Sequence, residues 1–182
     1  MKKINYIFLF TVVLFVIFSA QQLYAIEYAR ARYDLAMRYI KNKQPDFALM
    51  EFRSVIRDFP KSPLAQRSVF AIAEYYYDHK MYHDAIKDFT GYIKSYPGSK
   101  ANVFAKAYLL KIIEEIIDPT LEEKDKLEDI KKEFFSTPLF LLFKEYKETS
   151  YRSPFRNKFK IRYDIDNIEV YKNGQFFLTL KP

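Results

Sequence analysis

The chain has 182 residues, of which 49% are hydrophobic and 29% charged, so it can form one packed domain with an appendage and is not generally disordered. It has no cysteine, which excludes a disulfide framework, a thiolate nucleophile, a cysteine-based zinc site and a lipoprotein anchor. The formal net charge of +7 favours an acidic partner or an anionic membrane surface, and it says nothing about the fold.

The first 25 residues have the pattern of an export segment. Two lysines precede an apolar run over residues 7–18, in which Thr11 is the one polar residue. A basic start followed by such a run is typical of a secretory signal peptide, and the run is shorter than the roughly 20 residues that span a bilayer comfortably. Residues 1–25 are therefore a signal peptide or an N-terminal membrane anchor. Both alternatives predict a periplasmic protein, and residues 4–20 would anchor it to the inner membrane if they are retained.

After this segment the chain repeats itself with a period of 37 residues. Eight residues of the first unit recur unchanged in the second: Ala36, Tyr39, Lys43, Ala48, Phe52, Ile56, Pro60 and Ser62 become Ala73, Tyr76, Lys80, Ala85, Phe89, Ile93, Pro97 and Ser99. A fixed period of this size indicates stacked supersecondary units.

Each unit is predicted to be two helices joined by a short turn. In the first unit we expect helices over residues 33–41 and 47–59, the second with an apolar stripe on one side. Pro60 ends this helix because proline cannot continue a helix interior, and Ser62 can cap the next helix. A degenerate third unit is expected to have helices over about 101–117 and 121–135, so that the repeats occupy residues 27–135.

The order of a small residue, Tyr, Ala, Phe and Pro in each unit resembles the tetratricopeptide repeat family, whose usual period is about 34 residues. The longer period, with Pro-x-Ser between units, is similar to envelope repeat proteins of two kinds. One is the lipoprotein type of the outer-membrane β-barrel assembly machinery, whose lipobox cysteine is missing here, and the other is the Tol-Pal coordinator type. The resemblance covers roughly residues 28–117. It implies a TPR-like α-solenoid of antiparallel helix pairs without enzymatic activity.

The same resemblance implies which side chains face the concave groove, where such solenoids bind partner segments. They are Arg30, Tyr33, Met37 and Lys41 in the first unit and Arg67, Phe70, Glu74, Tyr77 and Asp78 in the second. Each of them could instead be an ordinary surface residue. The expected partners are other envelope proteins, and the membrane if the N-terminal segment is uncleaved. No cofactor, nucleic acid or small-molecule substrate is expected.

The C-terminal region has a different pattern. An extra helix is expected over residues 136–150, because apolar residues follow Thr137-Pro138 at helical spacing. Residues 155–182 are expected to form a small antiparallel sheet of two or three strands. Apolar and charged residues alternate there, and Asn173-Gly174 separates two strand-like runs as a type I′ hairpin turn requires. This sheet should pack on the last helices or add to the edge of a partner's sheet.

The chain shows no recognisable catalytic motif. Three glycines cannot build a phosphate-binding loop, and no set of nucleophile, base and orienting residue stands out. His79 and His83 have a spacing that suits a metal on one helix, but they flank a predicted turn, so we expect a surface turn there. The basic and aromatic residues over 152–162 fit a solvated strand face, or a surface that binds anionic lipid or an acidic protein groove.

The sequence therefore predicts a non-enzymatic interaction scaffold in the bacterial cell envelope. Two assignments are open: an accessory of outer-membrane protein assembly, or a structural component of a large periplasmic machine such as a flagellar motor collar. The alternative class is a periplasmic module that binds a peptide, a glycan or a lipid headgroup.

Overall fold

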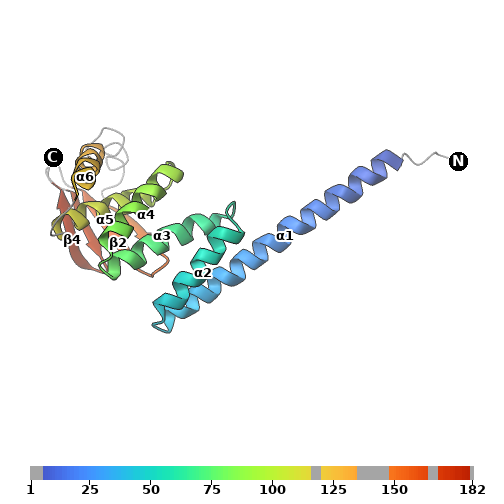
Figure 1. The fold of residues 1–182 in the computed structure, drawn as a ribbon, viewed down its shortest axis with the longest axis horizontal. Helices are drawn as coiled ribbons and strands as arrows, with labels where there is room; N and C mark the ends of the chain where they lie inside the picture. Colours follow the sequence, from blue (N-terminus) through green and yellow to red (C-terminus); the bar gives the residue numbers. More distant parts are fainter. Residues whose placement is uncertain (1–5, 116–119, 135–147, 164–167, 181–182) are drawn as a thin grey trace.

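The computed structural model describes residues 6–115, 120–134, 148–163 and 168–180. Within these ranges, six helices precede a four-stranded antiparallel sheet (Figure 1). The helices are α1 (Tyr6–Lys41), α2 (Pro45–Asp58), α3 (Pro63–Asp78), α4 (Tyr82–Ser95), α5 (Asn102–Glu115) and α6 (Leu121–Phe134). The strands are β1 (Glu148–Arg152), β2 (Lys158–Tyr163), β3 (Ile168–Lys172) and β4 (Gln175–Leu180). A mainly helical chain with a small C-terminal sheet is thus confirmed.

Helix α1 joins two segments that the sequence pattern separates. It runs for 36 residues without a break, so the predicted boundary between residues 25 and 27 lies inside a continuous helix. Among the α1 residues whose burial is described, the first buried one is Ala29, and the part before it extends away from the body of the molecule (Figure 1). Phe10 and Phe15 in that part are 64% and 71% exposed. Among the described residues, no helix has the length and apolar character needed to cross a membrane.

The turns within the first two helix pairs repeat in geometry as well as in sequence. Lys43 and Lys80 both adopt the left-handed conformation, with φ of 58° and 59°. In the first turn the amide of Gln44 donates to the carbonyl oxygen of Tyr39, and in the second the amide of Met81 donates to that of Tyr76. Both hydrogen bonds are 2.9 Å long. The α1–α2 and α3–α4 hairpins are therefore built on the same backbone plan.

Replacing Lys80 with glycine should stabilise the protein. A left-handed conformation costs an L-residue roughly 1 kcal/mol that glycine does not incur, so we expect the free energy of unfolding to rise by about 0.5–1 kcal/mol. The same substitution at Lys87, exposed in the interior of α4, should lower it by about 1 kcal/mol. Urea denaturation measures both, and a loss of stability on Lys80→Gly would contradict the left-handed turn.

The other recurring residues occupy equivalent core and cap positions. Ser62 Oγ accepts a hydrogen bond from the amide of Leu64, and Ser99 Oγ accepts one from the amide of Ala101, both at 3.2 Å. The recurring small and aromatic core residues have no exposed surface: Ala36, Ala48, Phe52, Ala73, Ala85 and Phe89. Each helix from α1 to α6 contacts the next one along the chain, as expected of stacked helix pairs.

The sheet has the strand order β1-β2-β3-β4, and every neighbouring pair is antiparallel. One face of it packs on the helices and shares a core with α3, α4 and α5. The sheet contributes Phe159, Ile161, Ile168, Val170, Phe177 and Leu178 to that core. The described strands of the sheet are therefore packed on the helical part.

Strand β1 corrects the predicted extent of the extra helix. Residues 148–150, expected at the end of a helix over 136–150, are extended instead. Thr149 and Ser150 lie opposite Ile161 and Lys160 of β2, which adds a fourth strand to the two or three expected. Pairing with β2 supplies backbone partners that outweigh the local helical preference. Residues 136–147 lie outside the described part of the chain.

The turn between β3 and β4 confirms the predicted hairpin. Asn173 and Gly174 have φ of 56° and 81°, as a type I′ turn requires. The Asn173 side chain also joins this turn to the start of β2, because its Oδ1 accepts the amide of Lys158 at 2.8 Å. Its Nδ2 donates to Oδ1 of Asn157 at 2.8 Å. These bonds hold the β1–β2 and β3–β4 turns side by side.

Candidate functional site

The helical face on which a partner was expected is covered by the chain's own sheet. Phe70 is fully buried, and its ring centroid lies 5.6 Å from that of Tyr151 in β1. Tyr77 makes a similar contact with Phe177 of β4, at 6.1 Å between ring centroids. Both residues therefore contact the sheet from α3 and do not line an open groove.

Glu74 is a buried carboxyl between the helices and the sheet. Its Oε1 accepts hydrogen bonds from Tyr108 Oη of α5 at 2.8 Å and from Asn157 Nδ2 of the β1–β2 turn at 3.1 Å. Burial raises the pKa of Glu74 to about 7, although hydrogen bonds from Ser153, Asn157 and Tyr108 act in the opposite direction. Glu74 therefore links three elements and titrates close to neutral pH.

Asp78 forms an ion pair with the sheet. Lys172 of β3 lies on the same sheet face as its register partner Phe159, and its Nζ is 3.1 Å from Oδ1 of Asp78. The same ammonium lies 5.0 Å and 5.1 Å from the ring centroids of Tyr108 and Tyr77. A cation held over two rings and against a carboxylate fastens the end of β3 to α3.

The groove residues predicted for the first unit are less covered. Tyr33 is 6% exposed, and the guanidinium of Arg67 lies 5.3 Å from its ring centroid. Met37 is half-buried, whereas Arg30 and Lys41 are exposed on α1. A partner could reach these two residues directly, but it could reach Phe70 and Glu74 only if the sheet moved away. Partner binding by the nine residues stays a prediction.

The outer face of the sheet is basic. Phe159 and Ile161 of β2 are each 1% exposed and point to the helices. The residues that alternate with them along β2 therefore lie on the opposite face, and they are Lys158, Lys160 and Arg162. Arg152 of β1 lies on the same face, because its register partner is Lys158. We call this surface, made of Arg152, Lys158, Lys160 and Arg162, the basic face.

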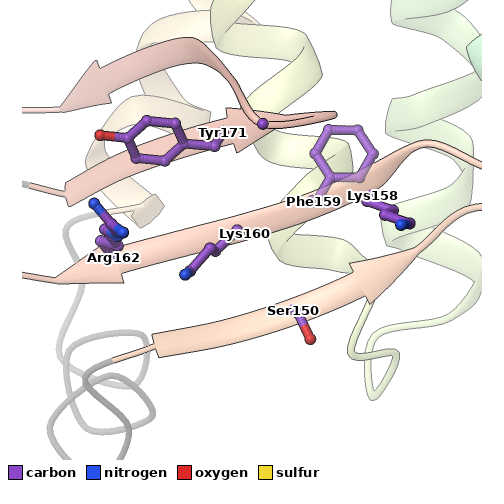
Figure 2. Close-up of a pocket in the computed structure, with 7 residues that line it drawn as sticks. Ser150, Lys158, Phe159, Lys160, Arg162 and Tyr171 are labelled. Carbon is purple, nitrogen blue, oxygen red and sulfur yellow. The ribbon is translucent and has the colours of Figure 1, made fainter.

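A hollow of about 540 Å³ lies on the basic face (Figure 2). It is lined by Ser150, Lys158, Phe159, Lys160, Arg162, Tyr171 and Gly174. Arg162 lies over the ring of Tyr171 at 5.4 Å from its centroid, and the Tyr171 hydroxyl donates to Oε2 of Glu169 at 2.8 Å. The hollow is thus basic along β2, and the Glu169 carboxylate lies beside its Arg162 end.

A second hollow, of about 400 Å³, lies between α1 and the turn from α2 to α3. Ala25 and Ile26 line it from α1, and residues 58–63 line it from the turn. Tyr24 and Tyr28 beside it are 63% and 50% exposed. Exposed aromatic and aliphatic surface next to a hollow is typical of a place where another apolar segment packs.

The described residues offer binding surfaces more clearly than catalytic chemistry. Within them, no three His, Asp or Glu side chains gather so that they could hold a metal ion. His79 stacks on Tyr75 with 4.1 Å between ring centroids, and its Nδ1 lies 2.7 Å from the Tyr75 carbonyl oxygen. No family model, curated protein or solved structure matches the chain.

Proposed function

We propose that the chain is a TPR-like α-solenoid that acts as a non-enzymatic protein-interaction scaffold in the bacterial cell envelope. The observation that carries this proposal is the structural repeat. Two helix hairpins share their left-handed turn, their serine cap and their buried alanine and phenylalanine positions at a spacing of 37 residues. Stacked hairpins of this kind present extended surfaces to other proteins and few enclosed pockets.

The placement in the envelope rests on the N-terminal apolar run and the basic residues before it. Export would put the body of the protein in the periplasm, with the segment either removed or kept as an anchor. Intact-mass measurement of the protein from its native cell separates these two outcomes, because cleavage removes about 20–25 residues. Recovery of the protein from the cytosolic fraction would contradict this part of the proposal.

The exposed part of the first helical unit is the surface on which this scaffold should bind its partner. Arg30 and Lys41 lie on the same helix at the two ends of its packed segment, and both are exposed. The hollow lined by Ala25 and Ile26 lies further toward the N-terminus of the same helix. Together they offer cationic and apolar groups, which suits a partner segment with acidic and apolar residues.

Site-specific photocrosslinking in the native cell tests the proposal. A photoreactive residue at position 30 or 41 should crosslink the same envelope protein, and one at the exposed position 87 on α4 should not. Two positions on one surface are used because a specific partner must contact both. Absence of a common crosslinked protein at positions 30 and 41 would contradict the scaffold proposal.

Two assignments within the scaffold class predict different phenotypes. An accessory of outer-membrane assembly should lower the level of outer-membrane barrel proteins when it is depleted. A structural component of a periplasmic machine such as a flagellar motor collar should leave those proteins unchanged and impair motility. Proteomics of the outer membrane after depletion, together with a motility assay, distinguishes the two.

A further inference from the structure

The basic face contains a charge arrangement that is unfavourable for the isolated protein. Arg152 and Lys158 are direct register partners on neighbouring strands, so two positive side chains lie opposite each other on one face. Within the described ranges, neither of them has a carboxylate at ion-pair distance. A third cation, Arg156, is exposed in the turn that joins the two strands. An anionic partner would relieve this repulsion.

The hollow on the basic face follows β2 and is shaped by small residues. Ser150 on β1 has a short side chain and Gly174 after β3 has none, so neither fills the space. The long side chains of Lys158, Lys160 and Arg162 line the hollow along β2. Figure 2 shows Ser150 and Lys160 on neighbouring strands. Its volume of about 540 Å³ exceeds what a single carboxylate or phosphate group needs. A ligand with several groups in a row would fill it.

The spacing of the cations favours an extended peptide as this ligand. Alternate residues of a strand are about 6.7 Å apart, and alternate side chains of an extended peptide have the same spacing. Carboxylates on two alternate residues of such a peptide can therefore lie beside Lys158 and Lys160, and the next alternate residue lies beside Arg162. Phe176 of β4, which is 61% exposed and in register with Tyr171, adds an apolar contact at the side of this row.

We propose that the basic face binds an extended acidic segment of a partner protein, with carboxylates on alternate residues facing first the Arg152–Lys158 pair and then Lys160. This inference rests on the proposed scaffold function and gives it a second, chemically defined site. It lies on the opposite side of the sheet from the helices, so a partner can bind there while the sheet stays in place on α3 and α5.

A peptide fits this surface better than a membrane or a nucleic acid does. The carboxylate of Glu169 lies beside Arg162, because the Tyr171 hydroxyl bonds to it and the guanidinium covers the Tyr171 ring. A uniformly anionic surface would bring negative charge against Glu169. A peptide can place an apolar or basic residue there and keep its carboxylates at the other end of the row.

Binding of synthetic peptides to the purified full-length chain in detergent micelles tests this proposal. The probe is a fluorescent eight-residue peptide in which Glu alternates with Thr and the last residue is Leu. One control peptide has Gln in place of each Glu, and another has the same Glu residues in one block. Fluorescence anisotropy should show binding of the alternating peptide that weakens at least tenfold between low and about 300 mM salt, with weaker binding of both controls.

Two variants and a matched control assign the binding to the basic face. Lys158→Gln should weaken the affinity about fivefold without lowering the melting temperature, because it also removes a repulsive pair. Arg152→Gln combined with Lys158→Gln should weaken it about thirtyfold. Lys94→Gln combined with Lys100→Gln removes the same charge from exposed positions elsewhere and should leave the affinity unchanged.

Three results would overturn the proposal. The first is equal affinity for the alternating and the block peptide, and the second is equal weakening by the basic-face and the control variants. The third is that binding of vesicles containing phosphatidylglycerol depends on Arg152 and Lys158, whereas binding of the peptide does not depend on them. That result would assign the face to a membrane. If photocrosslinks from positions 30 and 41 persist in any of these cases, the scaffold function stands and this second site falls.

Discussion

Replacing Phe70 with alanine should lower the free energy of unfolding by roughly 3–5 kcal/mol. Phe70 is fully buried, and its ring contacts those of Phe89, Tyr92 and Tyr108 in the helices and of Tyr151 in β1. Truncation leaves a cavity where the helices meet the sheet, and a close-packed core relaxes only in part around such a cavity. Chemical denaturation followed by circular dichroism measures the loss.

Phe176→Ala is the matched control for this prediction. Phe176 is 61% exposed on the outer face of the sheet, so its truncation should change the free energy of unfolding by no more than about 0.5 kcal/mol. The two variants delete the same atoms and differ in burial. If Phe70→Ala proved as stable as Phe176→Ala, Phe70 would be a surface residue of an open groove, and the covering of α3 by the sheet would be contradicted.

The helical repeat could be predicted from sequence because its signals are local. The turn lysines, the serine caps and the prolines that end helices act within a few residues, so Lys43 and Lys80 share one conformation wherever the rest of the chain lies. Asn173-Gly174 specifies its own hairpin for the same reason. Such signals predict each unit without information about distant contacts.

The position of the sheet could not be predicted in this way. Alternation along β2 shows that Phe159 and Ile161 face a core, but the pattern does not say which helices form that core. A charged residue such as Glu74 on a helix face suggests solvent or a partner. Its burial depends on Tyr108 and Asn157, the second of which is 83 residues away along the chain. Long-range contacts of this kind leave no periodic signal in one sequence.

The continuity of α1 across the predicted boundary at residues 25–27 was missed for a different reason. The sequence changes there from apolar to charged, which marks a change of environment, and no change of backbone conformation is required. Residues 19–41 contain neither glycine nor proline, so nothing in the chain breaks the helix. From residue 6 on, the predicted export segment and the first repeat differ in chemistry while sharing one helix.

Replacing Glu74 with glutamine should make the protein more stable above neutral pH. Burial raises the pKa of Glu74 from its usual 4.5 to about 7, so between these values the folded state keeps a proton that the unfolded chain has lost. The stability from this proton is complete below pH 4.5 and is lost as the pH rises through 7. At 1.36 kcal/mol per pKa unit, the whole loss is about 3 kcal/mol.

Glutamine resembles the protonated carboxyl in shape and charge. Its Oε1 can keep the hydrogen bonds from Tyr108 and Asn157, and its amide nitrogen takes the place of Oε2. The difference in free energy of unfolding between Glu74→Gln and wild type should therefore increase by about 2–3 kcal/mol in favour of the variant from pH 5 to pH 8.

At each pH, the free energy of unfolding of the wild type is subtracted from that of the variant. This difference contains no contribution from titrating groups that do not interact with Glu74. Glu27→Gln changes an exposed glutamate on α1, and its difference from wild type should stay near zero at both pH values. If Glu74→Gln lowered the stability equally at pH 5 and pH 8, the carboxylate would be needed in its ionised form, as an ion-pair partner of Lys172. The buried group would then hold the sheet on the helices by charge, and the neutral hydrogen-bonded link inferred from the geometry would be wrong.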